Sequence, residues 1–163
     1  MDKTSSALIA GAAVLTAAAL GARNGPQRPT TGVWYALLRK PSYTPPGPVI
    51  GAVWGGLELL LAGTGYRLLR SPPTEARDAA VGAWAATLGG LAGFPYLFFR
   101  EKRLGASTVA SGVMLASALG TVVAAREVDK PAAAMTLPLT AWVGFATVLS
   151  GVLWRRNRWL SRD

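Results

Sequence analysis

The chain has 163 residues and contains neither cysteine nor histidine. Disulfides, thiolate catalysis and metal sites built from Cys and His are therefore excluded. Charge is scarce too, because 15% of the residues are Asp, Glu, Lys or Arg while 51% are hydrophobic. A soluble domain usually carries about 25% charged residues. The low share of charged residues argues against an ordinary soluble protein.

The hydrophobic residues lie in five long runs: Ala7–Ala22, Val49–Tyr66, Ala79–Phe99, Ser107–Ala125 and Ala132–Trp154. Each run approaches the roughly 20 residues that a helix needs to cross a bilayer. Only one charged residue, Glu58, falls inside a run. A buried soluble bundle is the alternative, but soluble helices normally keep a charged face. We expect an all-α integral membrane protein of one domain, with transmembrane helices at about 5–22, 48–69, 79–99, 107–125 and 132–154.

The basic residues divide unequally between the two sides that five crossings would define. One side carries six, namely Lys3, Arg67, Arg70, Arg77, Arg126 and Lys130. The other carries eleven, namely Arg23, Arg28, Arg39, Lys40, Arg100, Lys102, Arg103, Arg155, Arg156, Arg158 and Arg162. Because short loops rich in Lys and Arg stay in the cytosol, the N-terminus is predicted outside and the C-terminus in the cytosol. This distribution favours membrane topology over nucleic acid as the reason for the net charge of +9.

The segment before the second run, WYALLRKPSYTPPGPVIGAVW, joins an aromatic pair, a basic pair and four prolines. Proline fixes φ, lacks an N–H and pushes the preceding residue towards extended geometry. The aromatic pair suits a membrane interface, where amphipathic rings sit at headgroup level. We therefore predict a stiff, non-helical loop that contains Pro41, Pro45, Pro46 and Pro48.

This segment resembles the signature of the translocator protein family (TspO/MBR, the peripheral-type benzodiazepine receptor family), WY-x-x-L-x-KP-x-W-x-PP followed by V-W-x-x-L-Y. Tyr43 replaces a Trp of that signature, and Glu58 replaces an aromatic residue. The matching positions are Trp34, Tyr35, Leu38, Lys40, Pro41, Pro45, Pro46, Val53, Trp54 and Leu57.

Two further segments are similar to the same family. The last run, PLTAWVGFATVLSGVLWRRN, resembles P-Y-L-A-W-x-x-F-A-T-x-L-N-Y-x-x-W-R-x-N, and GFPYLFFREKRLG is a weaker match to W-x-W-P-P-I-F-F-x-x-x-x-x-G. Thr87 and Leu91 stand where the family has Gln and Asn, so a polar group of the ligand pocket is missing. The Tyr of the family's sterol motif is also absent, because Ser150 and Gly151 occupy its Asn-Tyr positions. No specific sterol binding through that motif is predicted.

The resemblance implies five helices around one pocket, which binds porphyrin-type tetrapyrroles, benzodiazepine-like drugs or sterols under a lid made by residues 23–47. No cofactor is expected beyond such a ligand. The ligand-binding residues predicted on this basis are Tyr35, Pro45, Trp54, Glu58, Phe94, Phe98, Pro138, Trp142 and Ala146. Aromatic walls suit planar ligands, although each ring could instead pack the bundle or anchor it at the interface. Arg39 and Lys40 could meet porphyrin propionates, but topology alone also explains that basic pair.

An ionisable residue inside a span is costly and is by default a functional hypothesis. Glu58 lies one turn after Trp54, so it could face the same cavity, protonated or hydrogen-bonded to Tyr35 or to a ligand. The alternative is that it reaches the interface or pairs with an Arg of a neighbouring helix. The sequence offers no such Arg at mid-span.

No catalytic triad, carboxylate pair or phosphate loop is present in the sequence. The main hypothesis is therefore a membrane ligand-binding protein, not an enzyme, that senses, sequesters or transports tetrapyrrole-like or lipid-like molecules. The alternatives are a light-dependent porphyrin-degrading enzyme, with Trp54 and Trp142 beside the bound ring, and a small-molecule transporter or channel. A channel would need a continuous polar path.

Three questions of assembly and location stay open. Small-xxx-small pairs at Gly51/Gly55, Gly89/Gly93 and Ala116/Gly120 favour close packing within the bundle, with a homodimer as the alternative. The first run also resembles a weak signal peptide, but the family begins with a helix there, so a retained helix is predicted. Composition suggests a bacterial envelope membrane, and the mitochondrial outer membrane is the alternative.

Overall fold

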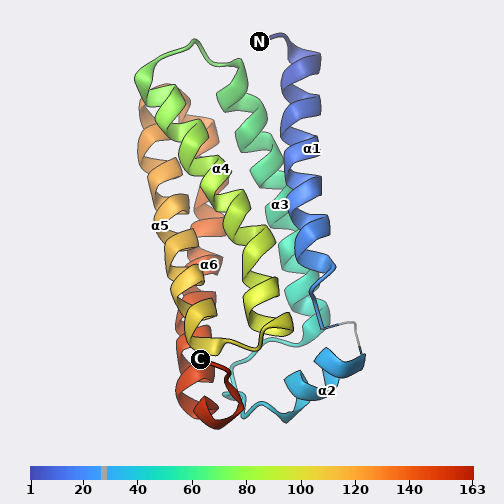
Figure 1. Ribbon diagram of the computed structural model, residues 1–163. Helices are drawn as coiled ribbons and strands as arrows, with labels where there is room; N and C mark the ends of the chain where they lie inside the picture. The colour runs from blue at the N-terminus through green and yellow to red at the C-terminus, as the bar shows by residue number, and fades with distance from the viewer. Residues whose placement is uncertain (27–28) are drawn as a thin grey trace.

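The computed structural model describes residues 1–26 and 29–163 and shows an elongated helical bundle (Figure 1). The long helices are α1 (Lys3–Ala22), α3 (Gly47–Arg70), α4 (Glu75–Pro95), α5 (Leu104–Val128) and α6 (Lys130–Arg156). The short elements are α2 (Pro29–Leu37), a π-helical turn η1 (Tyr96–Arg100) and a 3-10 turn η2 (Arg158–Leu160). Gln27 and Arg28 belong to the predicted lid, and Arg28 also to the predicted basic set, but both lie outside the described residues.

Five helices of the described chain are long and apolar enough to cross a membrane. One of these spans is α4 together with η1. The predicted all-α membrane fold is thereby confirmed. The helices form a closed ring in the order α1, α3, α6, α5 and α4, because each packs against the next and α4 returns to α1. The chain's N-terminus lies at one end of the bundle, and α2 and the C-terminal residues lie at the other (Figure 1). We call the end that holds α2 and the C-terminal residues the lid end.

Short polar side chains start most of the helices. Asp2, Thr74 and Asp129 each accept the N–H of the residue three positions on, at 2.9, 3.1 and 2.8 Å, so they cap α1, α4 and α6. Such caps satisfy N–H groups that have no partner within the helix. The helix α3 begins instead with Pro48 in its first turn, where the missing N–H costs nothing.

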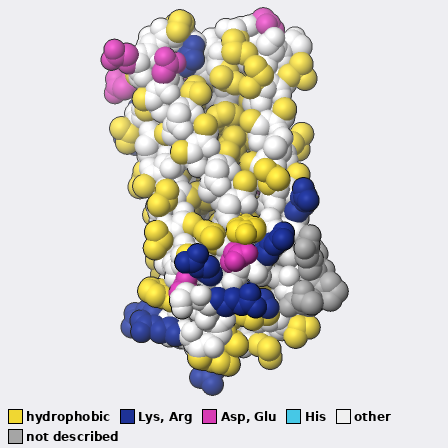
Figure 2. All heavy atoms as spheres, viewed as in Figure 1, with side chains coloured by type: hydrophobic (Ala, Val, Ile, Leu, Met, Phe, Trp, Pro, Cys, Tyr) yellow, Lys and Arg dark blue, Asp and Glu magenta, His cyan; other side chains and the backbone are white. Residues whose placement is uncertain are grey.

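The bundle is apolar outside and small or weakly polar inside, as expected for helices packed in lipid. Large side chains such as Leu15, Leu59 and Val109 are 70%, 77% and 68% exposed. Figure 2 shows such hydrophobic side chains along the whole body of the molecule. The interior holds buried alanines together with hydroxyl side chains that mostly bond within the bundle, among them Thr64, Thr87, Ser111, Thr121 and Thr136.

The structure differs from the sequence prediction in the first loop. Residues 23–47 were expected to contain no helix, yet α2 occupies Pro29–Leu37. Trp34 and Leu38 anchor this segment, since they are only 7% and 4% exposed against the bundle. The proline-rich stretch that follows is non-helical as predicted, except that Pro48 lies inside α3. Burial of Trp34 and Leu38 against the bundle thus stabilises a short helix where the proline content predicted none.

The expected packing of the glycine pairs is wrong for two of the three pairs. A Cβ added at Gly51, Gly55, Gly89 or Gly93 would meet no atom within 4 Å, so these residues face open space. In the third pair Gly120 lies between helices, because a Cβ there would be 3.6 Å from Ala83, whereas Ala116 is exposed. The tightest approaches involve other glycines, at Gly21, Gly65 and Gly90.

Candidate ligand site under the first loop

The first loop is held across the lid end by the C-terminal residues. Trp34 donates its indole N–H to the backbone oxygen of Leu160 at 3.4 Å. The side chain of Trp34 packs with Leu38 against Phe98, Leu104 and Leu153. The loop therefore covers the ends of α4, α5 and α6 (Figure 1).

A single buried amide ties this loop to α6. The side-chain oxygen of Asn157 accepts the Arg39 N–H at 2.7 Å, and its NH₂ donates to Arg39 O at 3.3 Å and to Leu153 O at 2.8 Å. Asn157 is 0% exposed. Because both backbone groups of Arg39 are satisfied by one side chain, the amide sets the position of the loop. The sequence comparison matched Asn157 to a family pattern but assigned it no role.

The same C-terminal residues cap α5. Ser161 Oγ accepts the Leu104 N–H at 2.9 Å, and the Asp163 carboxylate accepts the N–H groups of Gly105 and Ala106 at 2.5 and 3.1 Å. The α5 N-terminus has no side-chain cap of its own. Residues 157–163 thus join the first loop to two helices, a connection that no sequence pattern indicated.

Beneath the loop lies an aromatic cluster of Trp34, Tyr35, Phe94, Phe98 and Phe99, here called the lid cluster. Phe98 is its centre, with ring centroids 5.8 Å from Trp34, 6.2 Å from Tyr35, 5.5 Å from Phe94 and 4.8 Å from Phe99. Phe98 and Phe99 belong to η1, which directly follows Pro95. The structure thus brings together the predicted residues Tyr35, Phe94 and Phe98. Phe98 is 3% exposed, so protein side chains already cover its ring.

A second aromatic group lies between the first loop and α6. Phe145 is 5.5 Å from Trp142 and 6.4 Å from Tyr43, a residue of the proline-rich stretch. We call these three rings the platform. Tyr43 is 51% exposed, and the other two rings are partly buried. Unlike Phe98 at the centre of the lid cluster, each platform ring keeps some surface uncovered. Phe145 was matched to the family pattern but was not among the predicted ligand residues.

The remaining predicted residues are placed as follows. Trp54 and Trp142 both pack against the main core at its edge, from α3 and α6. Pro45 and Ala146 are partly buried, whereas Pro138 is exposed on α6. The nine predicted residues therefore do not form one continuous wall. Their assignment as ligand contacts remains a prediction.

Glu58 is partly buried in the middle of α3. Within the described residues it forms no hydrogen bond and no ion pair, so neither Tyr35 nor an Arg is its partner. Thr87 and Leu91, at the positions of the family's amides, are buried at 0% and 7% exposure. The Thr87 hydroxyl is used within its own helix, since it donates to Ala83 O at 2.9 Å.

The two basic residues of the loop have different surroundings. Lys40 Nζ donates to Tyr35 O at 2.5 Å and lies 4.3 Å from the centre of the Tyr35 ring. Burial lowers the pKa of Lys40 and raises the pKa of the Tyr35 hydroxyl. The Arg39 guanidinium lies 5.6 Å from the ring centre of Trp159, a residue that is 64% exposed. Arg39 is thus the more accessible cation for an acidic ligand, while Lys40 is held on Tyr35.

No group of three Asp, Glu, Cys or His side chains that could hold a metal occurs within the described part of the chain. The candidate site instead offers aromatic surface with basic side chains at its margin. The site and the fold together define a multi-pass membrane protein whose bundle is covered at one end by a latched loop.

Comparison with known proteins identifies the family. The TspO/MBR family profile matches residues 9–155, and the chain belongs to that family. The human translocator protein is 32% identical over 126 residues, which cover 76% of this chain and 75% of the human protein. The sheep (Ovis aries) translocator protein is 31% identical over 127 residues, 77% of this chain and 75% of the relative. The tryptophan-rich protein TspO of Bacillus cereus is 28% identical over 132 residues, 79% of this chain and 84% of the relative.

Proposed function

We propose that the protein binds a planar, largely apolar small molecule, of which a porphyrin-type tetrapyrrole is the prime candidate and a sterol-like lipid the second. The binding site is the platform of Tyr43, Trp142 and Phe145 at the edge of the first loop, extended by Trp54. The protein uses this binding to sense, sequester or transport the ligand across or within its membrane.

One observation carries this proposal: the platform is an aromatic surface that the fold leaves partly uncovered beside a latched loop. Phe98, the centre of the lid cluster, is 3% exposed and has no free face to offer a ligand. An offset-stacked aromatic pair contributes about 0.5–1.5 kcal/mol beyond the area it buries. Several half-exposed rings on one surface therefore favour a flat ligand.

The margin of the site supports an acidic, flat ligand. Arg39 belongs to the same loop as Tyr43, and its guanidinium rests on exposed Trp159. A carboxylate on the rim of a tetrapyrrole would pair with this cation. The loss of the family's amides at Thr87 and Leu91 removes polar selection inside the bundle, which favours ligands recognised by shape and stacking.

The transport alternative has support in the name "translocator protein" of the mammalian relatives. The enzymatic alternative, light-dependent degradation of a bound porphyrin, would use Trp142 and Trp54 as redox-active neighbours of the ring. Trp142 is the better placed of the two, because it touches another platform ring.

A matched pair of tyrosine variants tests the platform. Protoporphyrin IX is titrated into purified protein and its binding is followed by absorbance and by quenching of tryptophan fluorescence. Tyr43→Leu and Trp142→Leu should each weaken binding about three- to tenfold, since each removes one stacking partner. Tyr96→Leu is the control, because Tyr96 is 41% exposed and lies outside the platform.

Equal affinities for the Tyr43 and Tyr96 variants would reject the platform. Saturable binding of a sterol without any binding of protoporphyrin would move the assignment to the lipid-like class. A light-dependent change of the porphyrin spectrum that disappears in Trp142→Phe would favour the enzyme. An unchanged spectrum would favour a binder.

The homodimer and the cytosolic position of the lid end also belong to the proposal. Gly51, Gly55, Gly89 and Gly93 face outward with open space around them, which suits close approach of a second helix in lipid. The lid end carries most of the basic residues, which suits the cytosolic side.

A further inference from the structure

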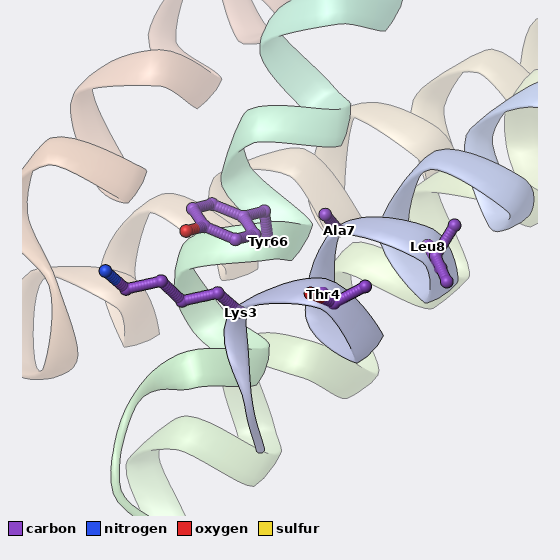
Figure 3. Close-up of a pocket in the computed structure, with 5 residues that line it drawn as sticks. All are labelled: Lys3, Thr4, Ala7, Leu8 and Tyr66. Atoms are coloured by element: carbon purple, nitrogen blue, oxygen red, sulfur yellow. The ribbon is translucent and has the colours of Figure 1, made fainter.

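A shallow, wide-open groove of about 520 Å³ lies between α1 and α3, at the end of the bundle opposite the first loop (Figure 1). Its lining residues are Lys3, Thr4, Ala7, Leu8 and Tyr66. It shares no residue with the lid cluster or the platform. In Figure 3 the Lys3 amine and the Tyr66 hydroxyl lie on the same side of the groove, and Ala7 and Leu8 follow along α1. The groove is thus polar at one mouth and apolar along its length.

The polar mouth gathers hydrogen-bond donors. Arg70 donates to the Tyr66 hydroxyl at 3.0 Å, and its guanidinium lies 5.4 Å from the centre of the Tyr66 ring. The Tyr66 hydroxyl is therefore an acceptor for Arg70, which leaves its own proton available. In the described part of the chain neither Lys3 nor Arg70 forms an ion pair. The nearby Asp2 carboxylate is engaged with the Ser5 N–H.

Two other basic residues at this end are paired with carboxylates instead. Arg67 pairs with Asp129 at 2.8 Å, and Arg77 pairs with Asp78 at 2.9 Å. Lys3 and Tyr66 line the mouth of the groove, and the Arg70 guanidinium adjoins it through its hydrogen bond to the Tyr66 phenol. Three donors of this kind match the oxygens of a phosphate.

The apolar part of the groove lies on the membrane-facing surface. Leu8 is 67% exposed on a helix that is long and apolar enough to span the bilayer. One turn further along α1, a Cβ added at Gly11 would meet no atom within 4 Å, so the surface there is open. An acyl chain could follow α1 from Ala7 past Gly11, with its phosphate at the level of the helix end.

We propose that this groove binds one anionic phospholipid of the surrounding leaflet, with its phosphate on Lys3, Tyr66 and Arg70 and an acyl chain along Ala7, Leu8 and Gly11. The charge complementarity of the mouth and the apolar length of the groove select this occupant. The site is independent of the proposed tetrapyrrole site, and its failure or success does not bear on the platform.

Native mass spectrometry of the full chain tests the headgroup contact. The protein is titrated with phosphatidylglycerol and, separately, with phosphatidylcholine of the same acyl chains. The wild-type protein should prefer phosphatidylglycerol, and Lys3→Gln and Arg70→Gln should each reduce that preference about fivefold, the value of one basic residue near an anionic lipid surface. Tyr66→Phe should reduce it less. Lys130→Gln, an exposed basic residue of the same end outside the groove, should leave it unchanged.

A second arm tests the tail. Gly11→Leu fills the open surface on α1 and should lower the affinity for both lipids, whereas Gly112→Leu, at an equally open position on α5, should not. Equal lipid preference in Lys3→Gln, Arg70→Gln and Lys130→Gln would overturn the proposal. Displacement of the lipid by inorganic phosphate alone would overturn it too, by assigning the mouth to a soluble anion. Melting temperatures of all variants show whether the fold is intact.

Discussion

One side chain, Asn157, determines how the first loop sits on the bundle. It is one of two asparagines in the chain and the only one of them that is fully buried. Its amide offers both a donor and an acceptor, which is what the free N–H and C=O of Arg39 require. An aspartate could accept but not donate, and a leucine could do neither. The residue type therefore follows from the backbone it must satisfy.

Replacing Asn157 by Leu should release the first loop. The change leaves the Arg39 N–H and C=O without partners at a cost of about 1–3 kcal/mol, so the loop will open more often. Hydrogen exchange of residues 31–46 and trypsin cleavage after Arg39 should both accelerate. Asn24→Leu is the control, because the Asn24 amide donates to Leu20 O near the end of α1, outside the latch. Equal acceleration in both variants would show that Asn157 is no latch.

Sequence patterns identified the aromatic residues of the candidate site. They did not show that these residues form two separate groups. Tyr35, Phe94 and Phe98 were predicted to share one site with Trp54 and Trp142. The structure separates them, because Phe98 collects the first group and the edge of the main core holds the second. Ring type and spacing say which residues suit a flat ligand, but only packing decides which ring faces remain uncovered.

At the level of the helices, the orientation of each glycine depends on the ring order of the bundle. Neighbouring residues in α4 show this clearly. A Cβ at Gly90 would lie 2.7 Å from the Met114 side chain of α5, while one at Gly89 would meet nothing within 4 Å. The spacing of small residues alone could not tell the inward from the outward face, since α4 carries glycine on both. The span positions were predictable because length and hydropathy determine them without reference to neighbours.

The pair Gly89 and Gly90 gives a test of α5 packing. Gly90→Ala should destabilise the protein by about 1–3 kcal/mol, because a methyl group must be fitted against Met114. Gly89→Ala should be neutral, or stabilising by up to about 1 kcal/mol from the better helix propensity of Ala. Thermal unfolding in detergent measures both. Equal melting temperatures for the two variants would contradict the inward orientation of Gly90.

The connection between α3 and α6 predicts a dependence of stability on pH. Burial alone would raise the pKa of Asp129, but hydrogen bonds from Arg67 and Ala132 and the Arg67 charge hold that pKa below its ordinary value. A carboxyl whose pKa is depressed in the folded state stabilises the fold above its unfolded pKa of about 4. This contribution is lost as the pH falls through the lower, folded value.

Comparison of the wild-type protein with Asp129→Asn checks the direction of this pH dependence. The wild-type protein should be the more stable at pH 7 by less than about 1 kcal/mol, because the pair is partly exposed to solvent. The difference in melting temperature should shrink as the pH is lowered from about 5 to about 3. Asp78→Asn is the control, because it removes the exposed carboxylate of a different ion pair, the one with Arg77. A difference that stays constant over this range would contradict the prediction.

At the scale of the whole molecule, charge is distributed very unevenly between the two ends. Among the described residues, the lid end has ten basic and two acidic side chains, and the other end has six basic and five acidic ones. The net side-chain charges of these residues are therefore +8 and +1, with Glu58 between the two ends. Figure 2 shows most of the Lys and Arg atoms on the viewed face near the lid end. Such asymmetry is the basis of the positive-inside rule.

The absence of cysteine makes the orientation directly measurable. Single cysteines are introduced in the first loop with Ser42→Cys and in the α3–α4 connection with Pro73→Cys, both at exposed positions. In intact cells a membrane-impermeant maleimide should label position 73 and not position 42. After permeabilisation both should react. The reverse pattern in intact cells would place the lid end outside.

The latch between the loop and α6 also constrains how the protein is made. The ribosome produces Arg39 118 residues before Asn157, the partner that holds it. Throughout that interval the first loop lacks its amide partner, although most of the bundle has already been synthesised. Closure of the loop is thus one of the last events of biogenesis, and a closed loop signals that the final helix has been inserted. A nascent chain halted before Asn157 would expose its aromatic residues to whatever chaperone or insertase attends it.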